Sequence, residues 1–390
     1  MTHEEQSSNV SQAVQLLAEH GFEGMANAIE ILFNEAMKIQ RQDYMGAAPY
    51  ERSDERRAYA NGFKPKTIKS RVGTLRLQVP QTRDGQFYPG VLEKGERSEK
   101  ALKLAVAEMY VQGVSTRKVA EITAELCGLD VTSTQVSRAA ALLDEELEAW
   151  RNRPLQAVEY LVLDARYEKV RLDGAVRDAA VLVAIGILPS GHRSVLGVSV
   201  SLSEAEVHWR VFLESLVNRG MHGLKYIVSD DHGGLRAARQ AVLPAVPWQR
   251  CQFHLAQNAM HYTPSHKMRS EVAEDIRDIF NAKDIDDAQA QLDRFFEKYK
   301  EAAPRLATWA EENLPEGFTV FQLPKEHQTR LRTTNMLERQ NREIKRRTRV
   351  ATLFPNEASA LRLVTAVLVE ISEEWETGKV YLTMRQTAST

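Results

Sequence analysis

The sequence is poor in cysteine and has no long hydrophobic run. Only two of its 390 residues are cysteines, Cys127 and Cys251, which excludes a disulfide framework and favours a reducing compartment. The longest strongly apolar run, residues 179–189, is too short to span a bilayer as a helix. The first ten residues lack the basic and apolar regions of a signal peptide. These absences predict a soluble intracellular protein.

The chain also has almost no net charge, which by itself argues against a nucleic-acid partner. The totals of 51 basic and 53 acidic residues nevertheless conceal local runs. Residues 61–83 hold six basic and no acidic residues, residues 325–349 hold nine basic and three acidic, and residues 271–301 hold ten acidic and five basic. Two basic segments can form a positive track that attracts phosphate backbones, although a single charge run is more often a solvated helix face.

The remaining composition is that of a globular protein long enough for two or three domains. Periodicity and turn residues locate the helices and strands, and no internal repeat occurs at a fixed period. We divide the chain into residues 1–43 (helical), 44–96 (basic, with two short strands around Gly73), 97–150 (helix-turn-helix-like, DNA-binding), 151–252 (strands and helices, first part of a catalytic core), 253–325 (all-helical) and 326–390 (C-terminal helices of the core).

Residues 151–252 give the clearest indication of a fold. The pattern predicts three strands, a helix, a strand that ends in an aspartate, a helix and a short strand. That is the order of a ribonuclease-H-like α/β fold. Open α/β sheets of this kind place their sites outside the carboxyl ends of the strands.

Residues 97–150 have the pattern of a helix-turn-helix. One helix has Ser115 as its N-cap and ends at Gly128, and the next begins after Thr132. In that arrangement the later helix would present Gln135 and Arg138 to base edges in a major groove. Three helices also pack together in many proteins that bind no DNA, so the pattern alone leaves both interpretations open.

Three acidic residues are candidate metal ligands. Asp164 and Asp230 each lie inside or at the end of an apolar strand, where a carboxylate is costly unless it is paired or bound to a cation. Mg²⁺ and Mn²⁺ prefer oxygen ligands, and two such ions can activate an attacking oxygen and stabilise a leaving oxygen at phosphorus. Glu338, in a helix rich in arginine and lysine, is the candidate third ligand.

Each of these residues also has a purely structural interpretation. Asp164 could be a turn residue, and Asp230 could cap the helix that follows it. Glu338 could form an ion pair with Arg342, four residues later. Asp231 could replace Asp230 if the register slipped by one residue, but we favour Asp230 because it directly follows the apolar strand.

Several short strings form one ordered series along the chain. The most specific are YLVLDARYEKVR (160–171), SDDHGGL (229–235), QRCQFH (249–254) and TTNMLERQNR (333–342). They are accompanied by TRDGQFYP (82–89), GVSTRKV (113–119) and RPL (153–155). The ordered set resembles the Mutator-type transposases of bacterial insertion sequences, which are related to eukaryotic Mutator-like and hAT transposases. The resemblance extends from about residue 50 to residue 381.

This resemblance implies a DDE transposase. The implied fold is multidomain α+β, in which a ribonuclease-H-like α/β catalytic domain is interrupted by an all-helical insertion domain and preceded by helical DNA-binding domains. Asp164, Asp230 and Glu338 would bind two Mg²⁺ ions, and Mn²⁺ would substitute. The protein would bind double-stranded DNA as a homodimer, at terminal inverted repeats and at target DNA. It would cleave and transfer strands by a copy-out, paste-in route, in the bacterial cytoplasm and on the nucleoid.

The insertion domain has motif residues of its own. Cys251 and His254 match the family's Cys-x-x-His motif, and we interpret them as structural or close to DNA, because the sequence has no second pair to complete a zinc site. Trp309 is placed like the aromatic residue that related enzymes use near a flipped base, although such a tryptophan is more often part of a core. The sequence departs from the family pattern at Asp231 and Gly233, where a glycine and a lysine are common.

The expected phosphate contacts are basic side chains of the two basic segments. Removing any of them should weaken DNA binding with little sequence preference. They are Lys64, Lys66, Lys69, Arg71, Arg339, Arg342, Lys345, Arg346 and Arg347.

Two other functions fit part of the same evidence. A non-catalytic DNA-binding regulator would use the helix-turn-helix and the basic segments, with the carboxylates serving structure alone. Another ribonuclease-H-like nuclease, such as a junction resolvase, would use the same metals without strand transfer. The long helical stretch before Glu338 argues against the second, because a minimal nuclease does not need it.

Overall fold

The computed structural model describes residues 2–48, 51, 53–95, 97–349 and 353–384, without the side chains of residues 2–8, 338 and 339. The chain divides into two units, Met1–Leu143 and Asp144–Thr390. Within the described ranges, no helix is both long enough and apolar enough to cross a membrane.

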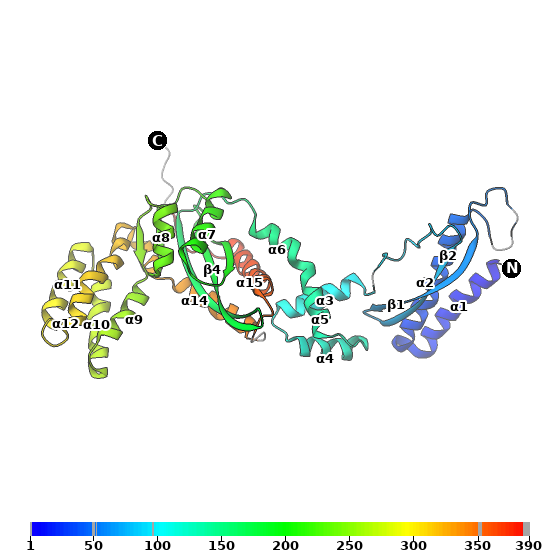
Figure 1. Ribbon diagram of the computed structural model, residues 1–390, viewed down its shortest axis with the longest axis horizontal. Helices are drawn as coiled ribbons and strands as arrows, with labels where there is room; N and C mark the ends of the chain where they lie inside the picture. Colours follow the sequence, from blue (N-terminus) through cyan, green and yellow to red (C-terminus); the bar gives the residue numbers. More distant parts are fainter. Residues whose placement is uncertain (1, 49–50, 52, 96, 350–352, 385–390) are drawn as a thin grey trace. The chain divides into compact units, whose positions relative to one another are not determined.

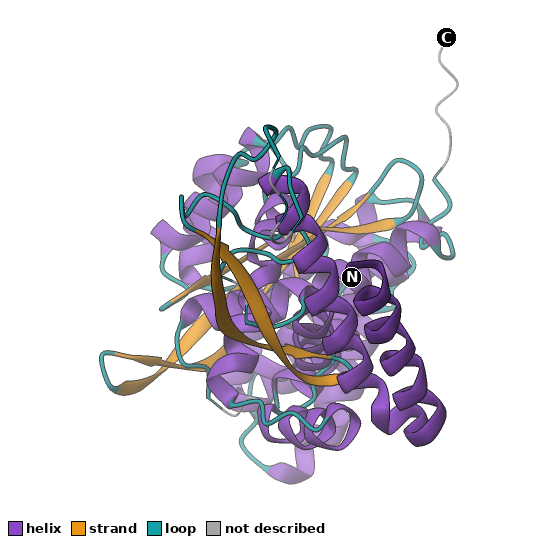
Figure 2. Ribbon diagram, turned by 90° about the vertical axis from the view of Figure 1, so that its right-hand side faces the viewer, coloured by secondary structure: helices purple, strands orange, loops and turns teal. Residues whose placement is uncertain are grey.

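The first unit begins with two helices and a long two-stranded antiparallel ribbon (Figure 2). The second helix packs against the ribbon, and the first helix packs against the second. Apolar and polar residues alternate along the second strand, so Leu75, Leu77 and Val79 are buried with Met37 of the second helix. The strands expected on either side of Gly73 are present and longer than predicted. These elements are α1 (Thr2–His20), η1 (Gly21–Gly24), α2 (Met25–Met45), β1 (Ala60–Ser70) and β2 (Gly73–Thr82).

Three further helices of the first unit enclose a small core that includes Val106, Val119 and Val136. Their ends follow the expected capping chemistry. The Ser115 hydroxyl accepts a hydrogen bond from the Lys118 amide, and the same helix ends at a left-handed glycine, residue 128, with φ +61°. These elements are α3 (Lys100–Val111), α4 (Thr116–Cys127), α5 (Ser133–Ala140) and η2 (Ala141–Leu143).

The second unit is built on a five-stranded mixed sheet in the order β5-β4-β3-β6-β7. Strands β3, β4 and β5 are antiparallel neighbours, whereas β6 and β7 run parallel to β3. Asp173 and Gly174 form the turn between β3 and β4 with φ values of +48° and +81°. The strands are β3 (Tyr160–Leu172), β4 (Ala175–Ile187), β5 (Arg193–Ser201), β6 (Tyr226–Ser229) and β7 (Trp248–Arg250).

Helices cover both faces of this sheet (Figure 1). Leu161 and Leu163 pack on one face with α7 and α8, and Val162 packs on the other with α14 and α15. A slip of one residue would move each set of side chains into the core on the other face, so packing of these particular side chains fixes the strand register. The covering helices are α7 (Glu206–Asn218), α8 (Gly233–Val242), α14 (Asn335–Thr348) and α15 (Glu357–Thr377).

A helical segment with its own core follows β7 (Figure 1). Leu255, Ile276 and Phe295 meet in that core, as the helical periodicity of residues 253–325 predicts. Its elements are α9 (Gln252–Tyr262), η3 (His266–Met268), α10 (Arg269–Phe280), α11 (Ile285–Tyr299), α12 (Pro304–Asn313), η4 (Leu314–Gly317) and η5 (Thr319–Gln322); α13 (Lys325–Leu331) then leads to α14.

Helix α6 (Asp144–Arg151), which the sequence places in the 97–150 segment, packs in the second unit. The Asp144 carboxylate accepts two hydrogen bonds of 2.6 Å from Arg362 of α15. Arg151 donates a hydrogen bond of 3.2 Å to the Thr365 hydroxyl on the same helix. The unit boundary therefore lies after Leu143, earlier than the boundary predicted at residue 150.

Candidate active site

Strand register brings the first two candidate carboxylates together. Strand β3 does not end at Asp164, as the sequence suggests, but continues because its later residues stay paired with β4. Parallel pairing puts Tyr160 opposite Tyr226 and Val162 opposite Val228. The same register places Asp164 opposite Asp230, which directly follows β6. Even-numbered residues of β3 face α14, so the Asp164 carboxylate lies on that side of the sheet.

The Asp164 carboxylate is held by a residue of α14. Its Oδ2 atom accepts a hydrogen bond of 3.0 Å from Nδ2 of Asn341. Burial raises the pKa of Asp164 to about 6, against the opposing effects of His254 and of the Asn341 hydrogen bond. Burial thus disfavours the charge on this carboxylate, and a bound cation would offset that cost.

A second contact ties the same strand to α14. The Arg166 guanidinium donates to the Asn341 carbonyl oxygen at 2.5 Å and pairs with the Glu168 carboxylate at 2.6 Å. The Thr348 hydroxyl donates to Glu168 at 3.1 Å. Together these contacts fix the position of α14 against β3 near the middle and the end of the helix.

The third candidate, Glu338, lies in α14, but its side chain is outside the described part of the structure, as is that of Arg339. Position 338 is three residues before Asn341, so the two positions share one face of the helix. The described His, Cys, Asp and Glu side chains form no group of three that could hold a metal ion. Glu338 is the expected source of the remaining ligand.

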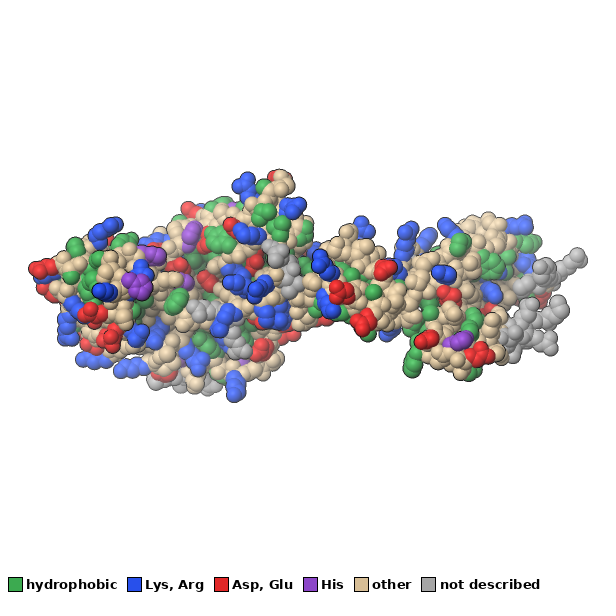
Figure 3. All heavy atoms as spheres, turned by 90° about the horizontal axis from the view of Figure 1, so that it is seen from below, with side chains coloured by type: hydrophobic (Ala, Val, Ile, Leu, Met, Phe, Trp, Pro, Cys, Tyr) green, Lys and Arg blue, Asp and Glu red, His purple; other side chains and the backbone are tan. Residues whose placement is uncertain are grey.

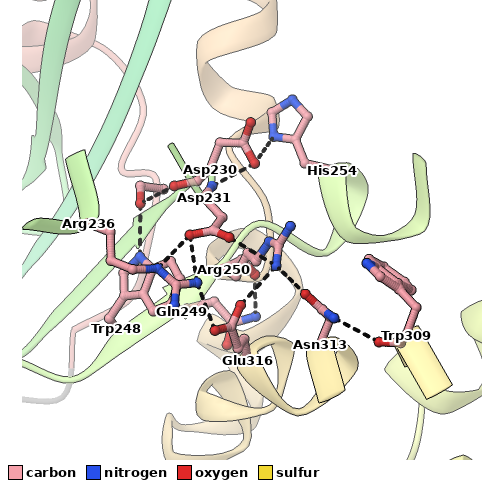
Figure 4. A network of polar contacts seen from close by, with 11 residues as sticks. Asp230, Asp231, Arg236, Trp248, Gln249, Arg250, His254, Trp309, Asn313 and Glu316 are labelled. Carbon is pink, nitrogen blue, oxygen red and sulfur yellow. Dashed lines mark hydrogen bonds and ion pairs between the residues drawn. The ribbon is translucent and has the colours of Figure 1, made fainter. Parts of the chain in front are cut away.

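On the other side of the pair, Asp230 faces the first turn of α9. Its Oδ1 atom lies 3.6 Å from Nδ1 of His254 (Figure 4). The buried Cys251 sulfur accepts hydrogen bonds from the Thr334 amide at 3.4 Å and the Thr334 hydroxyl at 3.5 Å. Cys251 and His254 therefore connect Asp230 to the residue that precedes α14.

These two motif residues also shift each other's ionisation. The Cys251 sulfur, followed by Asp230 and Asp164, raises the pKa of His254 to about 9 against the opposing effect of burial. Burial acts to raise the pKa of the Cys251 thiol, but hydrogen bonding with His254 and Thr334 holds it below its usual value. A protonated His254 would place a positive charge beside the carboxylate pair.

Asp231, the alternative to Asp230, is engaged elsewhere. Its carboxylate is 2.6 Å from Nη2 of Arg236 and 3.2 Å from Nη1 of Arg250 (Figure 4). Helix α8 begins two residues later, and its first turn packs closely against the backbone of residue 204. A Cβ at Gly234 would lie 2.1 Å from the Glu204 carbonyl oxygen. The Asp231 carboxylate is therefore occupied by two arginines.

The two arginines extend this network into the helical segment (Figure 4). Glu316 of η4 pairs with Arg236 at 2.8 Å and with Arg250 at 2.9 Å. Arg250, only 5% exposed, also donates to the Asn313 side chain at 3.1 Å. Asn313 in turn donates to the Trp309 carbonyl oxygen at 2.9 Å. The end of β6 is thereby linked to α12.

Trp309 is half-buried at the edge of the helical core. Its ring stacks on Tyr262 with a centroid distance of 5.2 Å and an interplanar angle of 19°. Tyr262 is itself 37% exposed. The stacked pair thus covers one face of the indole and leaves part of the aromatic surface accessible.

Basic side chains of α14 differ in their surroundings. Arg342 and Lys345 are exposed. Lysines and arginines are numerous on the face of the second unit that Figure 3 shows. Arg346 is also exposed but pairs with Glu343 at 2.7 Å. Arg347 is largely buried and pairs with Glu343 at 2.9 Å and Glu370 at 2.6 Å. Arg342 and Lys345 are therefore better placed for phosphate contacts than Arg347.

The basic residues expected to bind DNA through the first unit also have protein partners. Lys66 donates to the Tyr88 hydroxyl at 2.7 Å, and Arg71 pairs with Glu99 at 2.8 Å. Lys69 donates to a backbone carbonyl oxygen at 2.5 Å, whereas Lys64 is exposed. Three of these four side chains thus also stabilise the ribbon or the segments beside it.

Gln135 and Arg138 line a groove of about 440 Å³ that also includes Lys69, Arg97 and Lys103. The Gln135 side chain takes part in a capping box at the start of α5, because its oxygen accepts a hydrogen bond of 2.9 Å from the Thr132 backbone amide. This groove has no acidic side chain among its described lining residues. The two residues expected to read bases therefore lie in a basic groove rather than on an isolated helix.

The sequence interpretation missed the residues that support the carboxylates. Arg166 and Asn341 lie within the quoted strings, two residues after Asp164 and three after Glu338. That spacing was a usable signal, because residues two apart in a strand and three apart in a helix share a face. Arg250 lacked such a signal, since its partners come from distant parts of the chain.

Comparison with known proteins finds similarity to transposases along nearly the whole chain. The family model described as "Transposase, Mutator family" matches residues 1–378. The transposase for insertion sequence element IS406 of Burkholderia multivorans is 56% identical over 379 residues, covering 97% of this chain and 98% of the relative. The transposase for ISRM5 of Rhizobium meliloti is 42% identical, with 97% and 95% covered. The transposase for IS256 in transposon Tn4001 of Staphylococcus aureus is 37% identical, with 94% and 95% covered.

Proposed function

The chain belongs to the Mutator family of transposases, and from that premise we propose that it cleaves DNA at the ends of its own insertion sequence and joins those ends to DNA. The catalytic groups are Asp164, Asp230 and Glu338. The observation that carries this proposal is the register of β3 and β6, which puts Asp164 opposite Asp230 on the face covered by α14.

The fold supports the same proposal. Three antiparallel strands followed by two parallel ones, in the order β5-β4-β3-β6-β7, correspond to a ribonuclease-H-like sheet. The helical segment between β7 and α14 is then an insertion that precedes the last catalytic residue. Ligands in open α/β sheets bind outside the carboxyl ends of parallel strands, which is where Asp230 lies.

The donor set fits hard divalent cations. Asp164 and Asp230 offer carboxylate oxygens, and Glu338 would add a third carboxylate from α14. Two Mg²⁺ ions bound there supply activation of the attacking oxygen and stabilisation of the leaving oxygen, and Mn²⁺ would substitute. Asn341 orients the Asp164 carboxylate, and Arg166 holds α14 in place.

DNA binding is assigned to both units. Gln135 and Arg138, in the basic groove of the first unit, bind the terminal inverted repeats. Arg342 and Lys345 of α14 hold phosphates near the carboxylates, where Coulomb attraction adds affinity without reading bases. The protein acts as a homodimer on element ends and target DNA in the bacterial cytoplasm, by a copy-out, paste-in route.

The test uses labelled element-end DNA, Mg²⁺ and the full-length protein. Asp164→Asn, Asp230→Asn and Glu338→Gln should each abolish nicking and strand joining while end binding persists. Asp178→Asn is the matched control, because Asp178 is an exposed carboxylate that pairs with Lys169 on the β3–β4 hairpin. It should cleave and join as the wild type does.

Each other outcome identifies a different function. Cleavage without joining, under conditions where a pre-cut end is also not transferred, would identify a nuclease. Metal-independent end binding with no cleavage by the wild type, in Mg²⁺ and in Mn²⁺, would identify a regulator. Full activity in all three carboxylate variants would refute the assignment of the site.

A further inference from the structure

A groove of about 460 Å³ lies between α14 and α15, on a different face of α14 from Asn341. Gln340 lines this groove and is only 1% exposed. Neither its amide nitrogen nor its amide oxygen has a hydrogen-bond partner in the described structure. Burying an amide without partners costs free energy, so this side chain indicates a ligand that supplies both a donor and an acceptor.

A second buried group in the same groove also has an unpartnered polar atom. Arg347 is 8% exposed and uses two of its nitrogens to bind Glu343 and Glu370. Its remaining nitrogen, Nη1, has no partner in the described structure. The groove therefore presents two donors and one acceptor whose hydrogen bonds are unmade.

The charges of the groove exclude a simple anion site. Three arginines line it, and three glutamates balance them. A phosphate group alone would meet repulsion as well as attraction there. Ile371 and Trp375 add an apolar wall. A flat, uncharged heterocycle with donors and acceptors along its edge matches this combination of features.

We propose that the α14–α15 groove binds a single unstacked nucleobase of the DNA on which the protein acts, with adenine preferred. A glutamine amide pairs with adenine through two hydrogen bonds, to N7 and from the N6 amino group. Arg342, exposed at the rim, contacts the phosphate of the same nucleotide. Extruding a base into a protein pocket is an established way to hold a strand in register for chemistry.

The first experiment measures binding of free nucleotides to the full-length protein by saturation-transfer NMR. Deoxyadenosine 5′-monophosphate should bind, and deoxythymidine 5′-monophosphate should bind about tenfold more weakly, because thymine does not offer the same edge. Gln340→Leu removes both unpartnered atoms at similar volume and should weaken adenine nucleotide binding about tenfold or more. Gln289→Leu, an exposed glutamine of α11, is the matched control and should bind as the wild type does.

Two results would overturn the proposal. Equal binding of both nucleotides, unchanged in Gln340→Leu, would mean that the rim arginines attract phosphate and the groove holds no base. Absence of nucleotide binding, with Gln340→Leu melting at the same or a higher temperature, would mean that the amide binds only solvent.

That the base comes from DNA rests on the proposed function, so a second experiment uses element-end duplex with 2-aminopurine placed next to successive adenines. The reporter does not replace the adenine itself, because 2-aminopurine lacks the N6 amino group that Gln340 would bind. Binding should raise its fluorescence at one position through unstacking, and Gln340→Leu should lose that increase. A protein that cleaves the duplex with no such increase would overturn the groove assignment and leave the transposase function intact. A protein that neither binds nor cleaves the duplex would instead refute the function.

Discussion

Two carboxylate clusters lie next to each other at the end of β6 and differ in how their charge is balanced. Asp231 and Glu316 share two guanidiniums, those of Arg236 and Arg250, so the chain itself satisfies their charge. Asp164 and Asp230 instead accept hydrogen bonds from the Asn341 side chain and the Asp231 backbone amide, and Asp230 lies beside His254. The first cluster is complete without a ligand. The second has His254 as its described cationic partner, and we propose that bound metal ions balance the rest of its charge.

The largest expected effect is the loss of DNA cleavage that distinguishes Asp230 from its neighbour Asp231. Asp230→Asn should reduce cleavage of element-end DNA by about a thousandfold, because metal ligation contributes several kcal/mol to transition-state stabilisation. Asp231→Asn should reduce it less than about tenfold, since that carboxylate serves structure. Initial rates in Mg²⁺ at equal protein and DNA measure both. Equal losses in the two variants would show that the clusters do not have separate roles.

The next effect concerns stability. Arg250→Met should lower the free energy of unfolding by about 3 kcal/mol, at the lower end for a broken buried pair, since Asp231 and Glu316 keep partial contact with water. Arg236→Met should cost about 1 kcal/mol or less, because that side chain is more exposed. Urea denaturation followed by circular dichroism measures both. A larger loss of unfolding free energy in Arg236→Met than in Arg250→Met would contradict the interpretation that Arg250 contributes more to the stability of this cluster.

The smallest effect tests how Asp164 is held. Asn341→Ala should slow cleavage about tenfold, the equivalent of one lost hydrogen bond to a charged group, and raise the Mg²⁺ concentration needed for half-maximal rate. Asn335→Ala, at the exposed start of the same helix, is the control. If saturating Mg²⁺ leaves the defect of Asn341→Ala unchanged and the metal requirement is normal, then Asn341 does not orient the ligand.

Much of the local structure could be predicted from the sequence. The caps at Ser115 and Gly128, the turn at residues 173–174 and the strand that precedes Asp230 all follow from short-range chemistry. The capping box of Gln135 was also visible as a threonine three residues before a glutamine, although its effect on the side chain was not anticipated. These features depend on residues close together in the chain.

Long-range pairing could not be predicted in the same way. The juxtaposition of Asp164 and Asp230 depends on the register of two strands separated by two others in sequence. The order of strands and helices and the family resemblance suggested this pairing, but neither gave the register. The end of the first unit was misplaced because the contacts of α6 lie on α15, more than two hundred residues away. Asp231 was an ambiguity for the same reason, since its role depends on Arg250.

The buried arginine at the end of β7 also limits which helical segments this chain could accept after the sheet. Arg250 belongs to the sheet, but Glu316 and Asn313 belong to the helical segment that follows it. Replacing that segment with an unrelated one would leave the Arg250 guanidinium without Glu316 and Asn313 as partners. We therefore expect this chain to accept a foreign helical segment only when that segment supplies partners for Arg250.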